Sequence, residues 1–393
     1  MRVLTWRLWI ASMVWSAGMT SFSGSTAAPP ADQSLAASPH DELTIALPAQ
    51  EWRRVDRSVD RALAWLAAQQ DPDGSFPTIP IGQPAVTSLA VMAFLSDGHQ
   101  PGAGQYGERL NRAIDFVLDC QQPTGIFSFV RPEPFHIHLR SSHAASYNHA
   151  IAGLMLTEAY GQVTPERSER IAAAVHKALR VTLRLQVVPV KTNAEDRGGW
   201  RYLWKPGAHT PSDSDLSVTG WHLMFLRSAK NAQFEIPDAA VAEAVRYVER
   251  CYEPSEGGFV YGLFGPDRLV TRSTMGIGAL SLALGGEHQT VQARRAGEWL
   301  LEHPFDTYGA TTSRVDRFHY GAYYCSNAMA QLGGKYWRGF FPPLAKTLLD
   351  NQLADGSWPA ETNQDAIFGS SYSTALSVLA LTPAYQLLPI YQR

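Results

Sequence analysis

Two carboxylates separated by one residue stand directly before an apolar stretch of the chain. Asp213 and Asp215 belong to the run Asp-Ser-Asp-Leu-Ser at 213–217, and the apolar segment Val218–Leu226 follows. A carboxyl group held by hydrogen bonds and a charged neighbour can act as an acid or a base. An Asp or Ser before a helix can also accept hydrogen bonds from its first free N–H groups. Asp213 and Asp215 are therefore candidate catalytic residues, with helix capping as the alternative.

Histidines gather in a second stretch. His136, His138, His143 and His149 fall within fourteen residues. A histidine pair together with one of the two carboxylates would make a plausible zinc ligand set. No Cys or Glu stands at ligand spacing nearby, so the sequence favours a polar loop there. We expect neither a metal nor a cofactor.

The histidine-rich stretch ends in a run that suits a glycan. Tyr147, Asn148 and His149, with Arg272 and Tyr323 further along, can neutralise a uronate carboxylate and remove the adjacent proton. Tryptophans near these positions can stack on sugars. His149 is a third catalytic candidate. The candidate ligand-binding residues are Tyr147, Asn148, Arg272, Tyr323 and Trp221.

Two kinds of helix are expected to position these residues. In one kind, apolar residues recur at i, i+3, i+4 and i+7 with charges opposite, as in Val59, Ala62, Leu63 and Leu66. Such a stripe predicts a helix on the outside of the fold. The other kind is apolar nearly all round, which predicts burial, and each is too short to span a membrane. The segments of this second kind are Thr87–Leu95, His149–Leu156, Val218–Leu226, Thr274–Leu284, Tyr320–Leu332 and Tyr372–Leu381.

A recurring phrase joins the two kinds of helix. Leu348 is followed four places on by Gln352, four further on by Gly356, and then by Trp358. Related phrases end the other outer segments, and their Gln-like positions are Gln70, Gln121, Gln186, Tyr252 and His303. Self-similarity at a period of tens of residues indicates a repeat architecture. We expect the glycine to provide a left-handed turn, the Gln amide to bond backbone groups, and the aromatic ring to fill the gap between repeats.

The phrase apolar–x3–Gln–x3–Gly–x–Trp/Phe resembles the repeat of the prenyltransferase and squalene-oxidase repeat superfamily, which includes the terpene cyclases. The resemblance covers Val55 to about Tyr385. It implies an all-α fold, a single (α/α)6 toroid in which inner and outer helices alternate around a double ring.

The resemblance also bears on two motifs. Class II terpene cyclases carry Asp-x-Asp-Asp-Thr before an inner helix; here Asp213 and Asp215 match the first two acids, while Leu216 replaces the third. The run at 319–325 is similar to His-Gly-Gly-Tyr-x-Phe-Cys of prenyltransferase β subunits, which implies an anion-binding role for His319. If the protein is an enzyme, His319 is a fourth catalytic candidate. The zinc-binding Asp-x-Cys of that family is absent. No catalytic signature is therefore intact.

In such a toroid the loops that lead into the inner helices meet around one mouth, which is the expected ligand site. The stretches expected there are Ala85–Ser88, His136–His149, Ser212–Thr219, Thr271–Thr274, Phe318–Tyr324 and Ser370–Thr374. Inner-helix N-termini directed at the mouth would favour anions.

The N-terminus predicts export. Residues 1–28 have a basic start, a short apolar core and a small-residue end, as in a signal peptide. Residues 29–50, rich in Ala, Pro and Ser, are expected to be a flexible linker, and residues 51–393 the toroid. We expect a periplasmic or extracellular protein, anchored to the membrane if the leader is retained, with no transmembrane segment in the mature chain. The net charge of −3 without a basic block argues against nucleic acid as a partner.

The sequence leaves two functions open. One is a binding or scaffold protein whose central cavity takes a small apolar or glycan ligand. The other is an enzyme with acid–base chemistry at the mouth, similar to a terpene cyclase or a glycan lyase. An enzyme predicts that Asp215 and His319 face one cavity. A scaffold predicts that Asp215 caps its own helix and that side chains fill the cavity.

Overall fold

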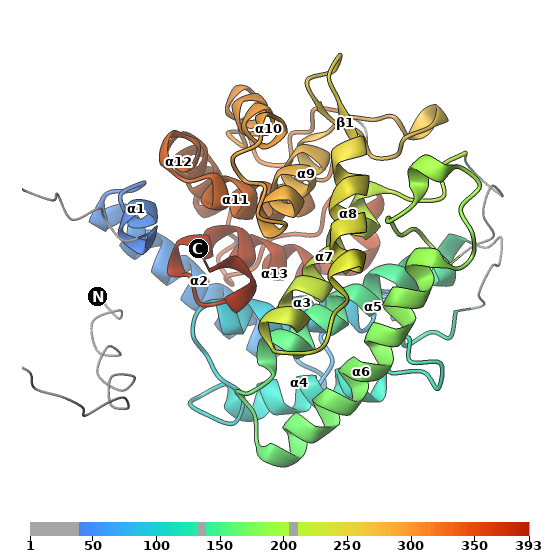
Figure 1. Cartoon of the computed structure of the whole chain (residues 1–393). Helices are drawn as coiled ribbons and strands as arrows, with labels where there is room; N and C mark the ends of the chain where they lie inside the picture. Colours follow the sequence, from blue (N-terminus) through green and yellow to red (C-terminus); the bar gives the residue numbers. More distant parts are fainter. Residues whose placement is uncertain (1–38, 133–138, 204–210, 314, 393) are drawn as a thin grey trace, which may run out of the picture. The chain divides into compact units, whose positions relative to one another are not determined.

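The computed structural model describes residues 39–132, 139–203, 211–313 and 315–392 (Figure 1). Two classes of helix alternate along these residues after a short first helix, α1 (Pro39–Thr44). The outer helices are α2 (Ala49–Gln69), α4 (Gly107–Asp119), α6 (Pro165–Val187), α8 (Asp238–Arg250), α10 (Val291–Glu302) and α12 (Gly334–Asp350). The inner helices are α3 (Ala85–Ser96), α5 (Leu139–Ala159), α7 (Leu216–Asn231), α9 (Arg272–Leu284), α11 (Phe318–Leu332) and α13 (Gly369–Leu381).

The six inner helices form a closed ring. Each packs against the next in chain order, and α13 returns to pack against α3. The outer helices surround this ring, as the view in Figure 1 shows. The expected (α/α)6 toroid is confirmed. Short connections complete it: the strands β1 (Tyr252–Glu253) and β2 (Gly258–Phe259), and the 3-10 turns η1 (Pro80–Gly82), η2 (Ala194–Asp196), η3 (Gly265–Asp267), η4 (Gln364–Phe368), η5 (Pro383–Tyr385) and η6 (Pro389–Tyr391).

The inner helices are buried on every side because they touch two inner neighbours and their own outer helices. All twelve residues of α3, for example, are buried. Small residues let the helices approach one another. A Cβ at Gly276 of α9 would lie 2.7 Å from the backbone nitrogen of Cys325 on α11, so a side chain there would push the two helices apart.

Where a repeat keeps its Gln, that residue ties the repeat to the next outer helix around the ring. Gln186 Nε2 donates to the carbonyl of Gly198 in its own turn and to that of Ala240 on α8, both at 2.9 Å. Gln70, Gln121 and Gln352 make the same pair of bonds at their own positions. The glycine is required by geometry: Gly198 has φ +87°, and a Cβ would lie 2.1 Å from the carbonyl oxygen of Glu243.

Two boundaries differ from the sequence prediction. Residues 39–50, within the expected linker, contain α1 and the start of α2, and the indole of Trp337 donates to the Leu43 carbonyl at 2.8 Å. Helix α5 begins at Leu139, ten residues before the predicted inner segment. Much of the expected histidine-rich loop is therefore helical, while His136 and His138 lie outside the described residues. Residues 1–28, predicted to be a signal peptide, also lie outside them.

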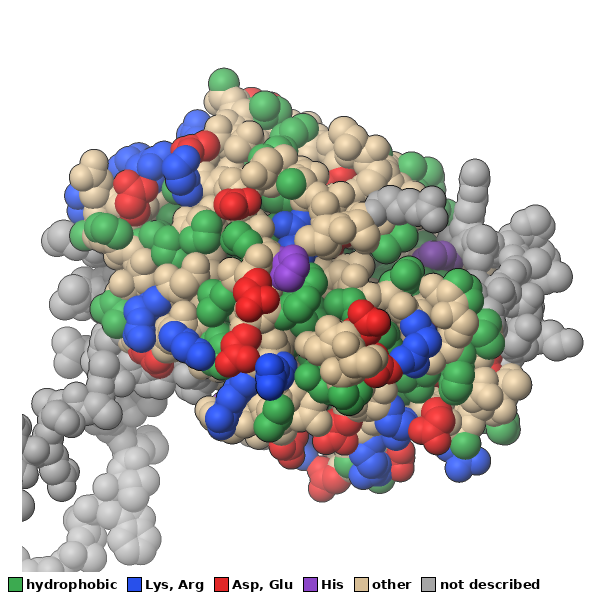
Figure 2. Space-filling view, turned by 90° about the horizontal axis from the view of Figure 1, so that it is seen from above, with side chains coloured by type: hydrophobic (Ala, Val, Ile, Leu, Met, Phe, Trp, Pro, Cys, Tyr) green, Lys and Arg blue, Asp and Glu red, His purple; other side chains and the backbone are tan. Residues whose placement is uncertain are grey.

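The surface agrees with the near-neutral composition. Acidic and basic side chains are interspersed over the face in Figure 2. Among the helices that the structure describes, none has both the length and the apolar character needed to cross a membrane. Cys120, Cys251 and Cys325 are buried, unpaired thiols.

Candidate functional site

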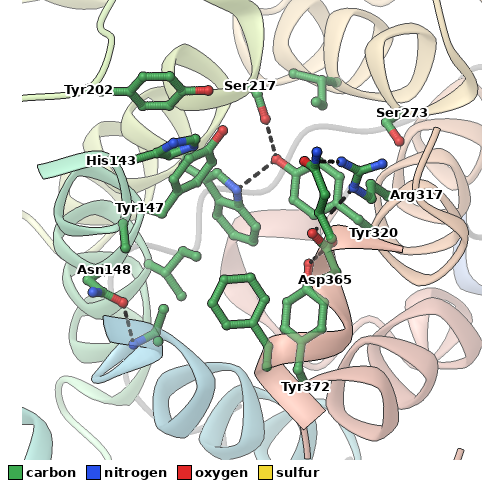
Figure 3. Close-up of a pocket in the computed structure, with 18 of the residues that line it drawn as sticks. His143, Tyr147, Asn148, Tyr202, Ser217, Ser273, Arg317, Tyr320, Asp365 and Tyr372 are labelled. Carbon is green, nitrogen blue, oxygen red and sulfur yellow. Dashed lines mark hydrogen bonds and ion pairs between the residues drawn. The ribbon is translucent and has the colours of Figure 1, made fainter. Parts of the chain in front are cut away.

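A cavity of about 500 Å³ opens where the inner helices begin. Every inner helix contributes to its wall, together with the loops that lead into these helices (Figure 3). The aliphatic and phenyl part of the lining is Ile81, Ala85, Val86, Leu89, Ala144, Ile151, Leu269, Ile277, Val315, Ile367 and Phe368. The remaining lining is mainly aromatic or hydroxyl-bearing.

Hydroxyl groups of the wall bond to one another. Ser217 of α7 and Tyr320 of α11 lie 2.6 Å apart, oxygen to oxygen, and the indole of Trp221 donates to Tyr320 at 3.0 Å (Figure 3). The hydroxyls of Tyr202 and Tyr261 share a short hydrogen bond. Burial raises the pKa of these tyrosines above the ordinary value, so the phenols are neutral at physiological pH.

His143 faces the cavity from the first turns of α5. Its ring stacks on that of Tyr202 with centroids 3.7 Å apart. Burial, and to a lesser extent the nearby Arg201 guanidinium, lowers the pKa of His143 to about 4. The imidazole is therefore neutral at physiological pH and can accept a proton.

Among the described residues, the charged side chains that line the cavity are ion-paired. Arg317 Nε lies 3.3 Å from Asp365 Oδ1, and its guanidinium also donates to Gln364 at 2.8 Å. Tyr372 donates to the other Asp365 oxygen at 3.2 Å (Figure 3). Asp267, which also lines the cavity, pairs with Arg201 at 3.0 Å.

The carboxylates singled out in the sequence lie behind the wall. Asp215 is fully buried and caps α7, accepting from the Val218 N–H at 2.7 Å. Its other oxygen lies 3.9 Å from Arg201 Nε. Burial raises the pKa of Asp215 to about 6. Asp213 accepts from the Thr192 N–H at 2.6 Å. Neither residue lines the cavity.

The two candidate catalytic histidines, His149 and His319, also lie behind the cavity wall and form hydrogen bonds there. His149 accepts from the Phe127 N–H at 3.2 Å, and its other nitrogen lies 3.0 Å from the Thr182 hydroxyl. His319 bonds Tyr308 and Ser377 at 3.1 and 2.9 Å. Burial lowers the pKa of His149 to about 4 and that of His319 to about 3. Neither ring belongs to the cavity wall.

The candidate ligand-binding residues divide into two groups. Tyr147, Asn148 and Trp221 line the cavity. Asn148 already bridges the Ala85 N–H and the Ile81 carbonyl, which fixes the loop before α3.

Arg272 and Tyr323 do not line it. Arg272 pairs with Asp316 at 2.9 Å, and its guanidinium lies 3.9 Å from the ring centroid of Phe305. Tyr323 lies under Trp221 and bonds Tyr391.

Helix geometry explains which residues meet. Residues at i and i+4 share a helix face, and the pairs His143 with Tyr147, Ser217 with Trp221, and Ser273 with Ile277 all face the cavity. If the sequence prediction had started this helix at Leu139, it would have placed His143 and Tyr147 on one face. Tyr202, Tyr261, Arg317 and Asp365 reach the site from loops or helix ends, for which the sequence has no periodic signal.

The comparisons with known proteins identify the fold. No family profile and no curated protein matches the sequence. Among solved structures, an inactive variant of an α-1,6-mannanase from Salegentibacter sp. HEL1_6, in complex with α-1,6-mannotriose, superposes with a TM-score of 0.59 at 10% identity, over 84% of this chain and 99% of that one.

Two further structures cover a similar share of this chain. The type II terpene cyclase MstE from Scytonema has a TM-score of 0.53 at 15% identity, over 86% of this chain and 99% of that one. A glycosidase variant in complex with glucose has a TM-score of 0.55 at 14% identity, over 87% of this chain and all of that one. The chain is therefore an α/α toroid with the fold of type II terpene cyclases and toroid glycosidases, which confirms the resemblance seen in the sequence at the level of the fold.

Proposed function

We propose that the protein binds a small, predominantly apolar molecule in the cavity at the amino-terminal ends of its inner helices. The main support for this proposal is that polar groups in the cavity wall already have partners within the protein. Tyr320, Asn148 and Arg317 each have protein partners already. A ligand therefore gains mainly by covering aliphatic and aromatic surface, at roughly 25 cal/mol per Å² of apolar area.

A glycan fits this wall less well. Each sugar hydroxyl that leaves water must find a new hydrogen bond, or its burial costs roughly 1–3 kcal/mol. Among the described wall residues, the buried Ser273 hydroxyl has no hydrogen-bond partner, and it can serve one polar group of a ligand. A molecule with an apolar body and a single hydroxyl or carbonyl matches this arrangement.

We infer that binding takes place outside the cytosol. The support is the signal-like composition of residues 1–28. Expression of the full chain with its leader, followed by the intact mass of the protein in the periplasm or medium, tests this inference. A cytosolic protein of full mass would overturn it.

Fluorescence titration tests the binding function. The probe is N-phenyl-1-naphthylamine, a neutral, apolar molecule that fluoresces when it leaves water. We expect saturable binding of one probe per chain. Ala144→Trp, which fills the cavity from α5, should weaken it at least about tenfold. The matched control is Ala239→Trp, at an exposed position of α8, which should bind as the wild type does. If mannotriose or uronic oligosaccharides stabilise the protein against unfolding while the probe does not bind, the proposed apolar ligand is wrong and a glycan takes its place.

Acid–base catalysis is a second candidate, and His143 supports it. Its unprotonated imidazole lies in the cavity beside Tyr147. Its low pKa makes it a weak base in the empty cavity, and the carboxylate of a bound uronate would raise that pKa towards the range that proton removal needs. The assay is ultraviolet absorbance of the unsaturated product from uronic polysaccharides. Activity lost in His143→Ala but retained in His149→Gln would establish this function. No turnover by wild type would eliminate it.

A further inference from the structure

The end of the ring opposite the cavity is occupied by the last residues of the chain. Residues 383–392, which we call the C-terminal plug, follow α13 and include η5 and η6. Its residues Leu388, Ile390 and Tyr391 are buried. Inner helices hold it from their carboxyl ends: Gln331 of α11 donates to the Tyr391 carbonyl at 2.6 Å, and Glu158 of α5 accepts from the Ile390 N–H at 3.2 Å.

A column of rings joins the plug to the cavity. Trp221, which lines the cavity, stacks on Tyr323 with centroids 5.4 Å apart and planes 11° from parallel. The Tyr323 hydroxyl makes a short hydrogen bond to the Tyr391 hydroxyl of the plug. Tyr391 also donates to Met224 Sδ, at 3.4 Å, on the same helix as Trp221. Two stacked rings thus separate the ligand cavity from the plug.

We propose that the C-terminal plug regulates the ligand cavity: the seated plug supports Trp221 through Tyr391 and Tyr323, and its release loosens that wall. The proposal rests on the ligand-binding function proposed above. The Tyr391 hydroxyl bonds both Tyr323 and Met224 Sδ, so its removal weakens the support of the ring column without changing a residue of the cavity lining.

Glu158 is the group that makes plug seating sensitive to pH. The carboxyl is buried and also accepts from the Ser228 hydroxyl of α7. The titratable groups that face it are Tyr391 of the plug and Tyr323 of α11, whose pKa values burial raises. Among the described residues it has no ion-pair partner, and burial raises its pKa from 4.5 to about 7.

The sign of this dependence follows from proton linkage. The seated plug favours the protonated carboxyl, while release of the plug returns Glu158 to water and to a lower pKa. Seating is therefore strongest below about pH 4.5 and weakens as pH rises to about 7, by at most roughly three-hundredfold. Above about pH 7 the Glu158 carboxyl is ionised in both the seated and the released state, so seating no longer changes with pH.

Probe affinity tests the coupling to the cavity. Tyr391→Phe removes the hydroxyl that meets Tyr323, and we expect the dissociation constant for N-phenyl-1-naphthylamine to rise about fivefold. The matched control is Tyr385→Phe, because that hydroxyl lies in the same plug but donates to Asp56 on outer helix α2 at 2.8 Å. Equal affinity in the wild type and both variants would overturn the coupling while leaving the binding function in place.

Amide hydrogen exchange tests the plug without any ligand. We expect protection of the Ile390 amide to fall between about pH 5 and about pH 7 relative to the ring helices. Glu158→Gln keeps the shape and can still accept from the Ile390 N–H through its amide oxygen, while its NH2 group faces Ser228 Oγ as a donor; because it cannot ionise, it should remove this fall. Protection of Ile390 equal to that of the ring helices at every pH would show that the plug does not open separately. If wild type does not bind the probe, the binding function fails, and this exchange result still decides whether the plug is releasable.

Discussion

The Asp215 carboxylate accepts a hydrogen bond from the backbone N–H of Val218 at 2.7 Å and thereby caps helix α7. Asp215 of the Asp-Ser-Asp-Leu-Ser run therefore directs its side chain to the backbone of its own helix. Asp215 lies behind the cavity wall, with Arg201 as its nearest cation. The capping contact matches the scaffold expectation, whereas the open cavity does not, because a scaffold was expected to fill it.

Substitution of Asp215 should separate capping from charge. Asn is also a good N-cap, so Asp215→Asn should retain most of the stability, whereas Asp215→Ala should lower the free energy of unfolding by about 1–2 kcal/mol more. Urea denaturation at neutral pH measures both. Equal losses in the two variants would mean that the charge beside Arg201 matters more than the cap.

The Gln of the repeats should contribute to stability through its two hydrogen bonds to neighbouring carbonyls. Gln186→Ala leaves the carbonyls of Gly198 and Ala240 without their donor, which should cost about 1–3 kcal/mol. The corresponding position in the fifth repeat is His303, whose ring bonds the Trp299 carbonyl and stacks on the Trp299 indole, both within its own helix end. His303→Ala should therefore cost less in the same thermal or urea unfolding measurement. A larger loss at His303 would contradict the proposed role of the amide bridge.

Arg272 should matter for stability and not for ligand binding. Arg272→Met leaves Asp316 buried without its cation, at a cost of about 3–5 kcal/mol. The double variant with Asp316→Asn should recover part of the loss. Probe affinity should stay within about twofold of wild type, since neither side chain lines the cavity. A selective loss of probe binding in a stable double variant would return Arg272 to the binding site.

Buried histidines should make the protein sensitive to acid. The pKa of His149 is about 4 in the folded protein and 6.5 in an exposed reference state, so the unfolded chain binds the proton more strongly. Stability should therefore fall as pH drops from about 6.5 to about 4, by roughly 3 kcal/mol at most for this group. His149→Gln should show a shallower dependence in urea unfolding at several pH values. The matched control is His176→Gln, at an exposed position of α6. A wild-type slope in His149→Gln would contradict the assignment.

Sequence periodicity predicted the alternation of outer and inner helices, because an apolar stripe indicates a half-buried helix and an all-apolar segment a buried one. The resemblance to the repeat superfamily implied that these helices close into a ring with one mouth. The sequence predicted the site residues less well. Placement of the α5 start at His149 instead of Leu139 hid the face shared by His143, Tyr147 and Ile151. At the end of a helix, tertiary contacts decide where a side chain points. Arg272, the first residue of α9, therefore points towards Asp316. Tyr202 and Tyr261 reach the cavity through loops whose paths no local pattern determines.

The measurement that tests the ligand-binding account most directly is the location of a heavy-atom-labelled apolar ligand in crystals of the protein. Crystals grown with 1-bromonaphthalene should show the anomalous signal of bromine inside the cavity, between Leu89, Ile151 and Trp221. Bromine found only on the outer surface or at the C-terminal plug, with ordered water filling the cavity, would contradict the account.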